Sequence, residues 1–549
     1  MREIFLRKQS SILSAALIIM VTYGLSHVLG LLKSRLLISY FFGSSAALLD
    51  VYYASMVIPE TVFQLLVMGA LSAAFIPIFS KYLAKNESEA WEMAGLTVNL
   101  VMFLMLVVTV VILVFAKPLA VLVAPGFSTA QISIMVNLLR VMLVSQIFFA
   151  ISGFLTGTIQ SNQRFLLPAI APLVYNLGII LGIVLLTPLL GIYGPAVGMV
   201  FGAVLHMVIQ LPLAISLGFK FVPKLNWRHP GVLEVAKLMP PRMLAMGIDH
   251  IEQFTAVILA SGLAAGSLSL FNVARLLYAI PTLLFGSTIG QAALPTLSSL
   301  VAQKKWPEFR KTLLDSCLQV VFLALPICVL LIVLRIPIVR LTFGAKTFPW
   351  EATLLTGQTL AVLLISAGFF AVMQIIVRAF YALHDTTTPL VVGIAAAVTN
   401  VALSIVLVNV FSLGIVGIAW ALSATTIIET LILGTVLLHK QFPTEEISKA
   451  AVSFFKLILL GIVTGLGLWI PMRILDQFIF DTTRTIPLLI LTIMTSIIGM
   501  GLYLLLSYVL KIDQLTAVLG LWERIKSWRS YLKAPAQSEP IILPTSEQN

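Results

Sequence analysis

The sequence predicts an all-α polytopic membrane protein with about fourteen transmembrane helices. Of its 549 residues, 60% are hydrophobic and 10% are charged, whereas soluble domains are about 45–50% apolar and about 25% charged. Apolar runs of about 20 residues, long enough to cross a bilayer, recur along the chain. Because these runs are continuous and do not alternate with polar residues as membrane β-strands do, they predict helices.

The predicted spans alternate between the two sides of the membrane. The apolar run after Arg2 is too long for a cleaved signal peptide, so it is the first span. Most loop lysines and arginines then fall on one side, and Lys346, Arg473 and Arg484 fall on the other. Because cytoplasmic loops collect cations, both termini are expected to be cytoplasmic, and the net charge of +12 needs no nucleic-acid partner. The spans centre near residues 22, 65, 104, 144, 176, 205, 250, 283, 322, 366, 398, 426, 461 and 496.

The chain contains an internal repeat. Segments 158–165 and 191–198 resemble segments 382–389 and 414–421, and similar pairs recur at offsets of about 218 to 224 residues. Each copy holds about six spans, so the repeat predicts two six-helix lobes of the same orientation, related by an axis along the membrane normal. The predicted parts are an N-lobe (1–222), a C-lobe (223–445), a helix pair (446–511), and a basic amphipathic segment with a disordered cytoplasmic tail (512–549).

Ionisable residues interrupt several spans. The stretch HVLGLLKSRLLISYFF (27–42) places His27, Lys33 and Arg35 in the first span. An ionisable group at membrane depth costs about 2.5–3.5 kcal/mol on insertion scales, so such groups usually face a cavity or pair with one another. For Arg35, Asp50, Arg140 and Arg378, snorkelling near a helix end is the alternative. The residues predicted to bind substrate in a central cavity are His27, Lys33, Arg35, Asp50 and Arg275.

Two kinds of helix indicate a moving gate. In the helix near 235–262, Arg242 and Asp249 share a face by heptad spacing, and a proline pair interrupts its start. This pattern indicates either a cavity-lining helix or a structural Arg–carboxylate pair inside the lobe. Flexible helices with proline and glycine at matching repeat positions also point to a gate. The gating and cavity candidates are Ser34, Pro59, Glu60, Arg242, Asp249, Glu252, Pro281, Gly286 and Arg378.

The cations predict the chemistry of the ligand. In a cleft of low dielectric they need anionic partners, and phosphate is the obvious candidate. A cationic cleft between two lobes predicts an alternating-access transporter of an anionic substrate. The sequence has no HExxH, GxxxxGKS, GxxxxGKT or CxxC motif, and its 6 histidines form no metal-ligand cluster. We therefore expect a transporter that is no enzyme and has no metal or cofactor.

Four stretches carry a resemblance to a known family: GALSAAFIPIFSKY (69–82), LMPPRMLAMGIDHIEQ (238–253), ARLLYAIPTLLFGSTIGQAALPTLS (274–298) and RAFYALHDTTTP (378–389). Over about residues 10–510 the chain resembles the MurJ (MviN) family of lipid II flippases, in the superfamily of MATE exporters and polysaccharide flippases. The resemblance implies translocation of undecaprenyl-diphosphate-linked peptidoglycan precursor (lipid II) from the inner to the outer leaflet of the bacterial cytoplasmic membrane. It implies no ATPase, and coupling to the membrane potential or to a monovalent ion.

The site residues of the family carry over in part. The resemblance places the family's cavity arginine of the eighth span at Arg275 and an aspartate of the second span at Asp50. Lys33 stands at an arginine position; lysine keeps the charge but loses the bidentate grip on phosphate. The other departures from the family pattern are His27 for an arginine, Ser34 for an aspartate and Phe63 for an arginine.

Several alternatives stay open at this point. The altered cations would also suit another undecaprenyl-diphosphate-linked glycan, such as an O-antigen or capsule unit. A cationic cleft disfavours a cation-coupled drug exporter of the MATE type, and a scaffold that recruits cell-wall enzymes would not need Lys33 or Arg275. The expected partners are the lipid-linked glycan, membrane lipids and the cell-wall synthesis machinery. The glycan, the coupling ion, the resting conformation and the oligomeric state, with a monomer among the options, stay open.

Overall fold

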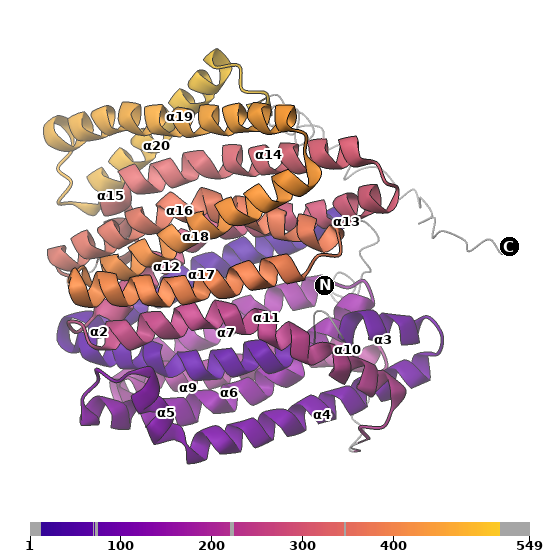
Figure 1. Ribbon diagram of the computed structural model, residues 1–549. Helices are drawn as coiled ribbons and strands as arrows, with labels where there is room; N and C mark the ends of the chain where they lie inside the picture. Colours follow the sequence, from indigo (N-terminus) through magenta and orange to yellow (C-terminus); the bar gives the residue numbers. More distant parts are fainter. Residues whose placement is uncertain are drawn as a thin grey trace, which may run out of the picture.

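The chain folds into a bundle of long, roughly parallel helices (Figure 1). The residues described by this computed structural model are 12–69, 71, 75–219, 224, 226–344 and 347–515. Within them the chain forms helices and no strand, which confirms the predicted all-α membrane fold. The predicted amphipathic segment and tail lie, from residue 516 on, outside the described residues.

The helices of the first half lie mostly in the lower part of Figure 1, and those of the second half in the upper part, with α19 and α20 at the top. The first half comprises α2 (Ile12–Phe63), η1 (Gln64–Met68), α3 (Ile76–Leu83), α4 (Glu87–Val114), α5 (Ala116–Val123), α6 (Thr129–Ser161), α7 (Leu166–Leu181), η3 (Gly182–Leu186), α8 (Thr187–Leu190), α9 (Tyr193–Val208) and α10 (Leu211–Ser216). The second half comprises α11 (Pro230–Ser261), α12 (Ser267–Pro281), η4 (Thr282–Ser287), α13 (Thr288–Ala302), α14 (Trp306–Val333), α15 (Arg335–Phe343), α16 (Trp350–Ala382), α17 (Thr387–Ile405), η5 (Val406–Val410) and α18 (Gly414–Gln441). The final pair is α19 (Thr444–Ile474), which continues into η6 (Leu475–Ile479), and α20 (Thr485–Val509).

Backbone features recur at the offset that the sequence repeat predicts. The π-helical turns η1 and η3 of the first half have counterparts in η4 and η5 of the second. The short helices α5 and α15 hold Pro118 and Pro337 at matching positions. Gly191 and Gly414 both adopt positive φ, at 56° and 57°. The two halves are therefore copies of one helical unit, while the exact boundaries at residues 222, 445 and 511 stay predictions.

Twelve helices in the described part of the chain are long and apolar enough to cross a membrane. Two further long helices are not among them: residues 12–44 of α2, which end at a kink at Ser45, and α11. These two helices carry ionisable residues that the sequence analysis singled out, among them Lys33, Arg35 and Glu252. Counted with the twelve, they agree with the prediction of about fourteen spans.

Glycines bring the backbones of two helices into contact within the first half. A Cβ added at Gly178 or Gly182, where α7 continues into η3, would collide with backbone atoms of Gly202 or Gly198 on α9. Backbone atoms cannot move aside by changing a rotamer, so the space is closed to any larger residue.

We therefore expect Gly182→Val to lower the melting temperature by several degrees, because overpacking of this kind costs about 3 kcal/mol. The measurement is thermal unfolding of the purified protein in detergent. Gly501→Val on α20 is the matched control, since a Cβ at Gly501 meets no atom within 4 Å, and it should leave the melting temperature unchanged. Equal melting temperatures for the two variants would contradict this packing.

The hydrophobic core joins the two halves at one end of the bundle. One cluster of buried residues combines α2, α5 and α6 with α12, α15 and α16. Toward the opposite end, a second cluster combines α13, α14, α16 and α18 with α19 and α20, and a third combines η1, α3, α4 and α6 with the start of α11. We call the end at α5 and α15 the closed end, and the end at α3 and α13, where the loop cations lie, the basic end. Among the described residues, the two halves share a core toward the closed end, whereas toward the basic end α11 packs against η1, α3 and α4 of the first half.

Candidate functional site

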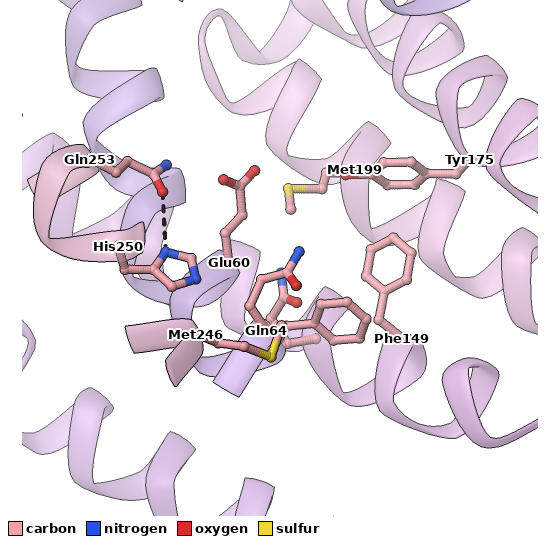
Figure 2. A pocket seen from close by; sticks show the side chains of 10 residues that line it. Glu60, Gln64, Phe149, Tyr175, Met199, Met246, His250 and Gln253 are labelled. Carbon is pink, nitrogen blue, oxygen red and sulfur yellow. Dashed lines mark hydrogen bonds between the residues drawn. The ribbon is translucent and has the colours of Figure 1, made fainter. Parts of the chain in front are cut away.

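A cavity of about 490 Å³ lies where the two halves meet (Figure 2). Its wall comes from α2, η1, α6, α7 and α9 of the first half and from α11 of the second. The first helix of the second half therefore covers a hollow in the first half. The ten residues that line it are Glu60, Phe63, Gln64, Gln146, Phe149, Tyr175, Met199, Met246, His250 and Gln253.

The polar side of the cavity is centred on a carboxylate. Glu60 on α2 lines this side of the cavity together with His250 and Gln253 of α11. Nδ1 of His250 lies 3.3 Å from Oε1 of Gln253 and 3.3 Å from Oγ1 of Thr61. Figure 2 shows Glu60, His250 and Gln253 together on one side of the space. These contacts connect the second half of the chain to the first at the level of the cavity.

Two cations interact with the same carboxylate. Lys33, in the first span, and Arg275, on α12, both lie within electrostatic range of Glu60, but neither forms an ion pair with it within 4.0 Å in the described part of the chain. Neither side chain is part of the cavity lining, so the cluster of Lys33, Glu60 and Arg275 lies beside the cavity. One carboxylate cannot neutralise two cations, and charge at membrane depth is costly unless it is paired. These three side chains by themselves therefore carry an excess of one positive charge, in a neighbourhood that also holds Glu252.

Aromatic rings form the opposite wall. The ring of Phe149 lies 5.6 Å from that of Phe63 and 4.8 Å from that of Tyr175, measured between centroids. It also lies 5.3 Å from the ring of His206, whose Nδ1 is 2.6 Å from Oγ of Ser152. Phe63 stands where the family resemblance places an arginine, so this chain presents a ring to the cavity at that position.

Asp50 joins the two halves at the closed end. Its buried carboxylate accepts hydrogen bonds from the backbone N–H of Gly266 at 2.7 Å and from the N–H and Oγ of Ser269 at 2.8 and 2.6 Å. These donors lie at the start of α12, where the helix dipole also favours a negative charge. Asp50 was predicted to bind substrate in the central cavity, whereas in the structure its carboxylate joins α2 to the start of α12. We call this contact the Asp50 latch. Arg275 lies further along the same helix α12.

Arg35 also contacts the second half at the closed end. Its Nη1 donates to the carbonyl oxygens of Leu341 at 2.7 Å and Thr342 at 3.4 Å, both on α15. The guanidinium is therefore held by backbone groups and is not part of the cavity lining. Further contacts between the halves at this end are Thr347 Oγ1 to Ser39 O, Gly126 N–H to Ser261 Oγ, and the ring pair Phe42–Phe348.

His27 and Ser34, at which this chain departs from the family pattern, lie in the same helix α2 as Lys33 and Arg35. His27 is partly buried, and its Nε2 is buried without a hydrogen-bond partner among the described residues. Ser34 is buried, directly after Lys33 in the first span. Neither side chain lines the cavity.

The predicted flexible positions coincide with irregular helix. Pro281 ends α12, and Gly286 lies in the π-helical turn η4 that follows. A Cβ at Gly286 would lie 2.9 Å from Cα of Ala371, so η4 packs closely on α16. Pro59 lies in α2 directly before Glu60 and five residues before Gln64, the first residue of the matching turn η1.

The remaining candidates lie on α11 and α16. Nη1 of Arg378 donates to O and Oε1 of Gln374, at 2.6 and 2.8 Å, on its own helix α16. Glu252 is half-buried on α11 and has an interaction partner. The side chains of Arg242 and Asp249 lie outside the part of the chain that the structure describes, so their predicted pairing stays a prediction.

Sequence reasoning missed most of the cavity wall. Phe149, Tyr175 and Met199 line the cavity, but in the sequence they resemble the other apolar residues of their spans, so no local signal distinguishes them. Gln146 did offer a signal: an amide in the middle of an apolar run, which the structure buries against Ser145 and the cavity. A buried amide of this kind is costly unless it is hydrogen-bonded.

The structure consists of two copies of one helical unit around a polar cavity, and the two copies are in contact at one end of the bundle. This arrangement is that of a membrane transporter. A family model described as "Lipid II flippase MurJ" matches residues 38–491. The relatives include probable lipid II flippases MurJ from Thermotoga maritima, 27% identical over 90% of this chain and 96% of the relative, and Haemophilus influenzae, 26% identical over 83% and 91%. The chain belongs to the family of the lipid II flippase MurJ.

Solved structures agree on the fold. A structure described as lipid II flippase MurJ in an inward closed conformation superposes with a TM-score of 0.72 at 23% identity, covering 89% of this chain and 98% of that one. An inward-facing multidrug transporter of the MATE family superposes with a TM-score of 0.61 at 14% identity, covering 74% and 92%. At these identities the likeness shows a common fold.

Proposed function

We propose that this chain translocates lipid II across the bacterial cytoplasmic membrane by alternating access, with the diphosphate bound between the two halves by Lys33 and Arg275. The observation that supports this proposal is their position: a cation from each half lies within electrostatic range of the carboxylate of Glu60, which lines the cavity. Membership of the family supplies the substrate, and the cluster supplies the chemistry that would hold its charged group.

Glu60 acts in this proposal as an internal counter-ion. Without substrate it partly neutralises Lys33 and Arg275, which lowers the cost of keeping both at membrane depth. A diphosphate brings more negative charge and several acceptor oxygens, so it replaces Glu60 as the partner of the two cations. Because the cations come from different halves, the diphosphate would bind most tightly when the halves approach, and only such differential affinity can drive a conformational change.

The charge of the loops supports an orientation with the basic end in the cytoplasm. Substrate then loads from the basic end, and the Asp50 latch and Arg35 keep the opposite end shut. The tail of the lipid stays in the bilayer. Release to the outside requires these contacts to open, and the membrane potential or a monovalent ion would supply the energy.

A second candidate is another undecaprenyl-diphosphate-linked glycan. Phe63, which lines the cavity where the family resemblance places an arginine, favours this reading, because a ring in place of a cation changes what the glycan part can contact. Export of an organic cation would suit Glu60 and the aromatic wall, but Lys33 and Arg275 beside Glu60 would repel such a substrate.

The test is complementation in bacteria depleted of their own lipid II flippase, with membrane expression of each variant checked. We expect the unmodified chain to restore growth, and Lys305→Ala to restore it equally, since Lys305 is an exposed residue of the basic end whose nearest acidic group is Glu308 at 4.0 Å. Absence of rescue by a well-expressed chain would favour the second candidate, which rescue of a strain lacking an O-antigen or capsule flippase would then support.

A further inference from the structure

A second cavity, of about 360 Å³, lies at the basic end on the side away from the first half. Three separate segments form it: the start of α14, the first turns of α19, and the residues that follow α20. It shares no lining residue with the cavity at Glu60. Its lining residues are Pro307, Lys311, Leu314, Asp315, Leu318, Glu446, Ala450, Ser453, Lys456, Lys511, Ile512, Asp513 and Gln514.

The second cavity carries an excess of cations. Each of its three segments contributes one lysine, Lys311, Lys456 and Lys511, and no ion pair within the described residues holds any of them. Of the three carboxylates in the lining, Glu446 accepts a hydrogen bond from Nε of Arg310 at 3.0 Å and is thereby neutralised. Three lysines then face the two carboxylates of Asp315 and Asp513, which leaves one positive charge.

The surroundings of this cavity place it where a membrane begins. On α19, the apolar Phe455 directly before Lys456 is 65% exposed. At the end of α20, Tyr508 is 75% exposed, three residues before Lys511. Exposed apolar side chains on helices that span a bilayer face lipid tails, and lysines beside them lie at the level of the head groups. An apolar surface exposed to lipid therefore borders a cavity that is lined by three lysines.

We propose that the second cavity binds the head group of an anionic phospholipid from the leaflet at the basic end. A phosphodiester carries one negative charge, which matches the excess of one positive charge, and its oxygens accept hydrogen bonds from three lysines on three different segments. The acyl chains lie along the exposed faces of α19 and α20. Such a lipid connects the final helix pair to α14, and this role is independent of the substrate carried by the cluster at Glu60.

The test uses the full chain, purified and delipidated in detergent, with its thermal unfolding followed as lipid is added. We expect phosphatidylglycerol to raise the melting temperature with increasing concentration, as any ligand of the native state does. Each lysine near an anionic head group strengthens binding roughly fivefold. The variant Lys311→Gln/Lys456→Gln/Lys511→Gln should therefore need about 100-fold more phosphatidylglycerol for the same shift.

The matched control is Lys85→Gln/Lys304→Gln/Lys305→Gln, which removes the same charge from exposed positions of the basic end outside the cavity; it should respond as the unmodified chain does. Asp315→Asn removes a competing carboxylate and should strengthen the response. Three results would overturn the proposal: equal weakening in both triple variants, an equal shift with zwitterionic phosphatidylcholine, or loss of the phosphatidylglycerol response when inorganic phosphate is added at the same concentration.

Discussion

Replacing Arg275 by alanine is expected to abolish growth rescue in the complementation assay, although the protein still reaches the membrane. The change leaves Lys33 facing Glu60 alone, so the cluster no longer carries excess positive charge. Removing one partner from a hydrogen-bonded charge site usually costs about 2–5 kcal/mol, which corresponds to a loss of at least about 30-fold in binding. The measurement is growth, together with the amount of lipid II that reaches the outer leaflet.

A double variant separates the loss of a substrate contact from a structural defect. If Glu60 is the counter-ion of the cluster, Arg275→Ala/Glu60→Gln restores one unpaired cation and should recover part of the transport that Arg275→Ala loses. Two variants that are equally inactive would show that Glu60 does not compete with the substrate for these cations. Full activity of Arg275→Ala would remove Arg275 from the proposed site altogether.

Replacing Asp50 by alanine is expected to open the closed end. The substitution removes a buried carboxylate that accepts three hydrogen bonds from the start of α12. Hydrogen bonds to charged groups contribute about 1.5–3 kcal/mol each, and the donors left behind lose their partner. We expect a lower melting temperature and a shift toward the outward-open state, which reduces transport even though the cluster at Glu60 is intact.

The opening can be measured by labelling a cysteine placed at Ser267, a buried residue of this contact, with a membrane-impermeant maleimide from the side of the closed end. Both native cysteines, Cys317 and Cys328, are buried. Labelling should be several-fold faster with Asp50→Ala than without it. Ser269→Ala is the matched control, because it removes the hydroxyl donor and keeps both backbone donors, so its effect should be smaller. Unchanged labelling with Asp50→Ala would exclude a latch at this position.

Some features of the site followed from local properties of the sequence. Lys33 and Arg275 could be singled out because a charge inside an apolar run is expensive wherever it lies, and the structure brings both to the carboxylate of Glu60. Asp50 was recognised by the same argument, but its partners were not. The start of α12 that it binds lies more than 200 residues further along the chain, and nothing near Asp50 in the sequence indicates that helix.

The sequence by itself determined that this protein is a helical membrane protein built from a repeated unit, because the length of apolar runs and the spacing of similar segments are properties of neighbouring residues. Only the tertiary structure decided which charged residues meet. Arg35 and Lys33 lie two positions apart on one helix, yet Arg35 binds carbonyl groups of α15 whereas Lys33 faces Glu60. The side chains of a helix point in different directions around its axis, so their partners depend on how distant helices pack against each face.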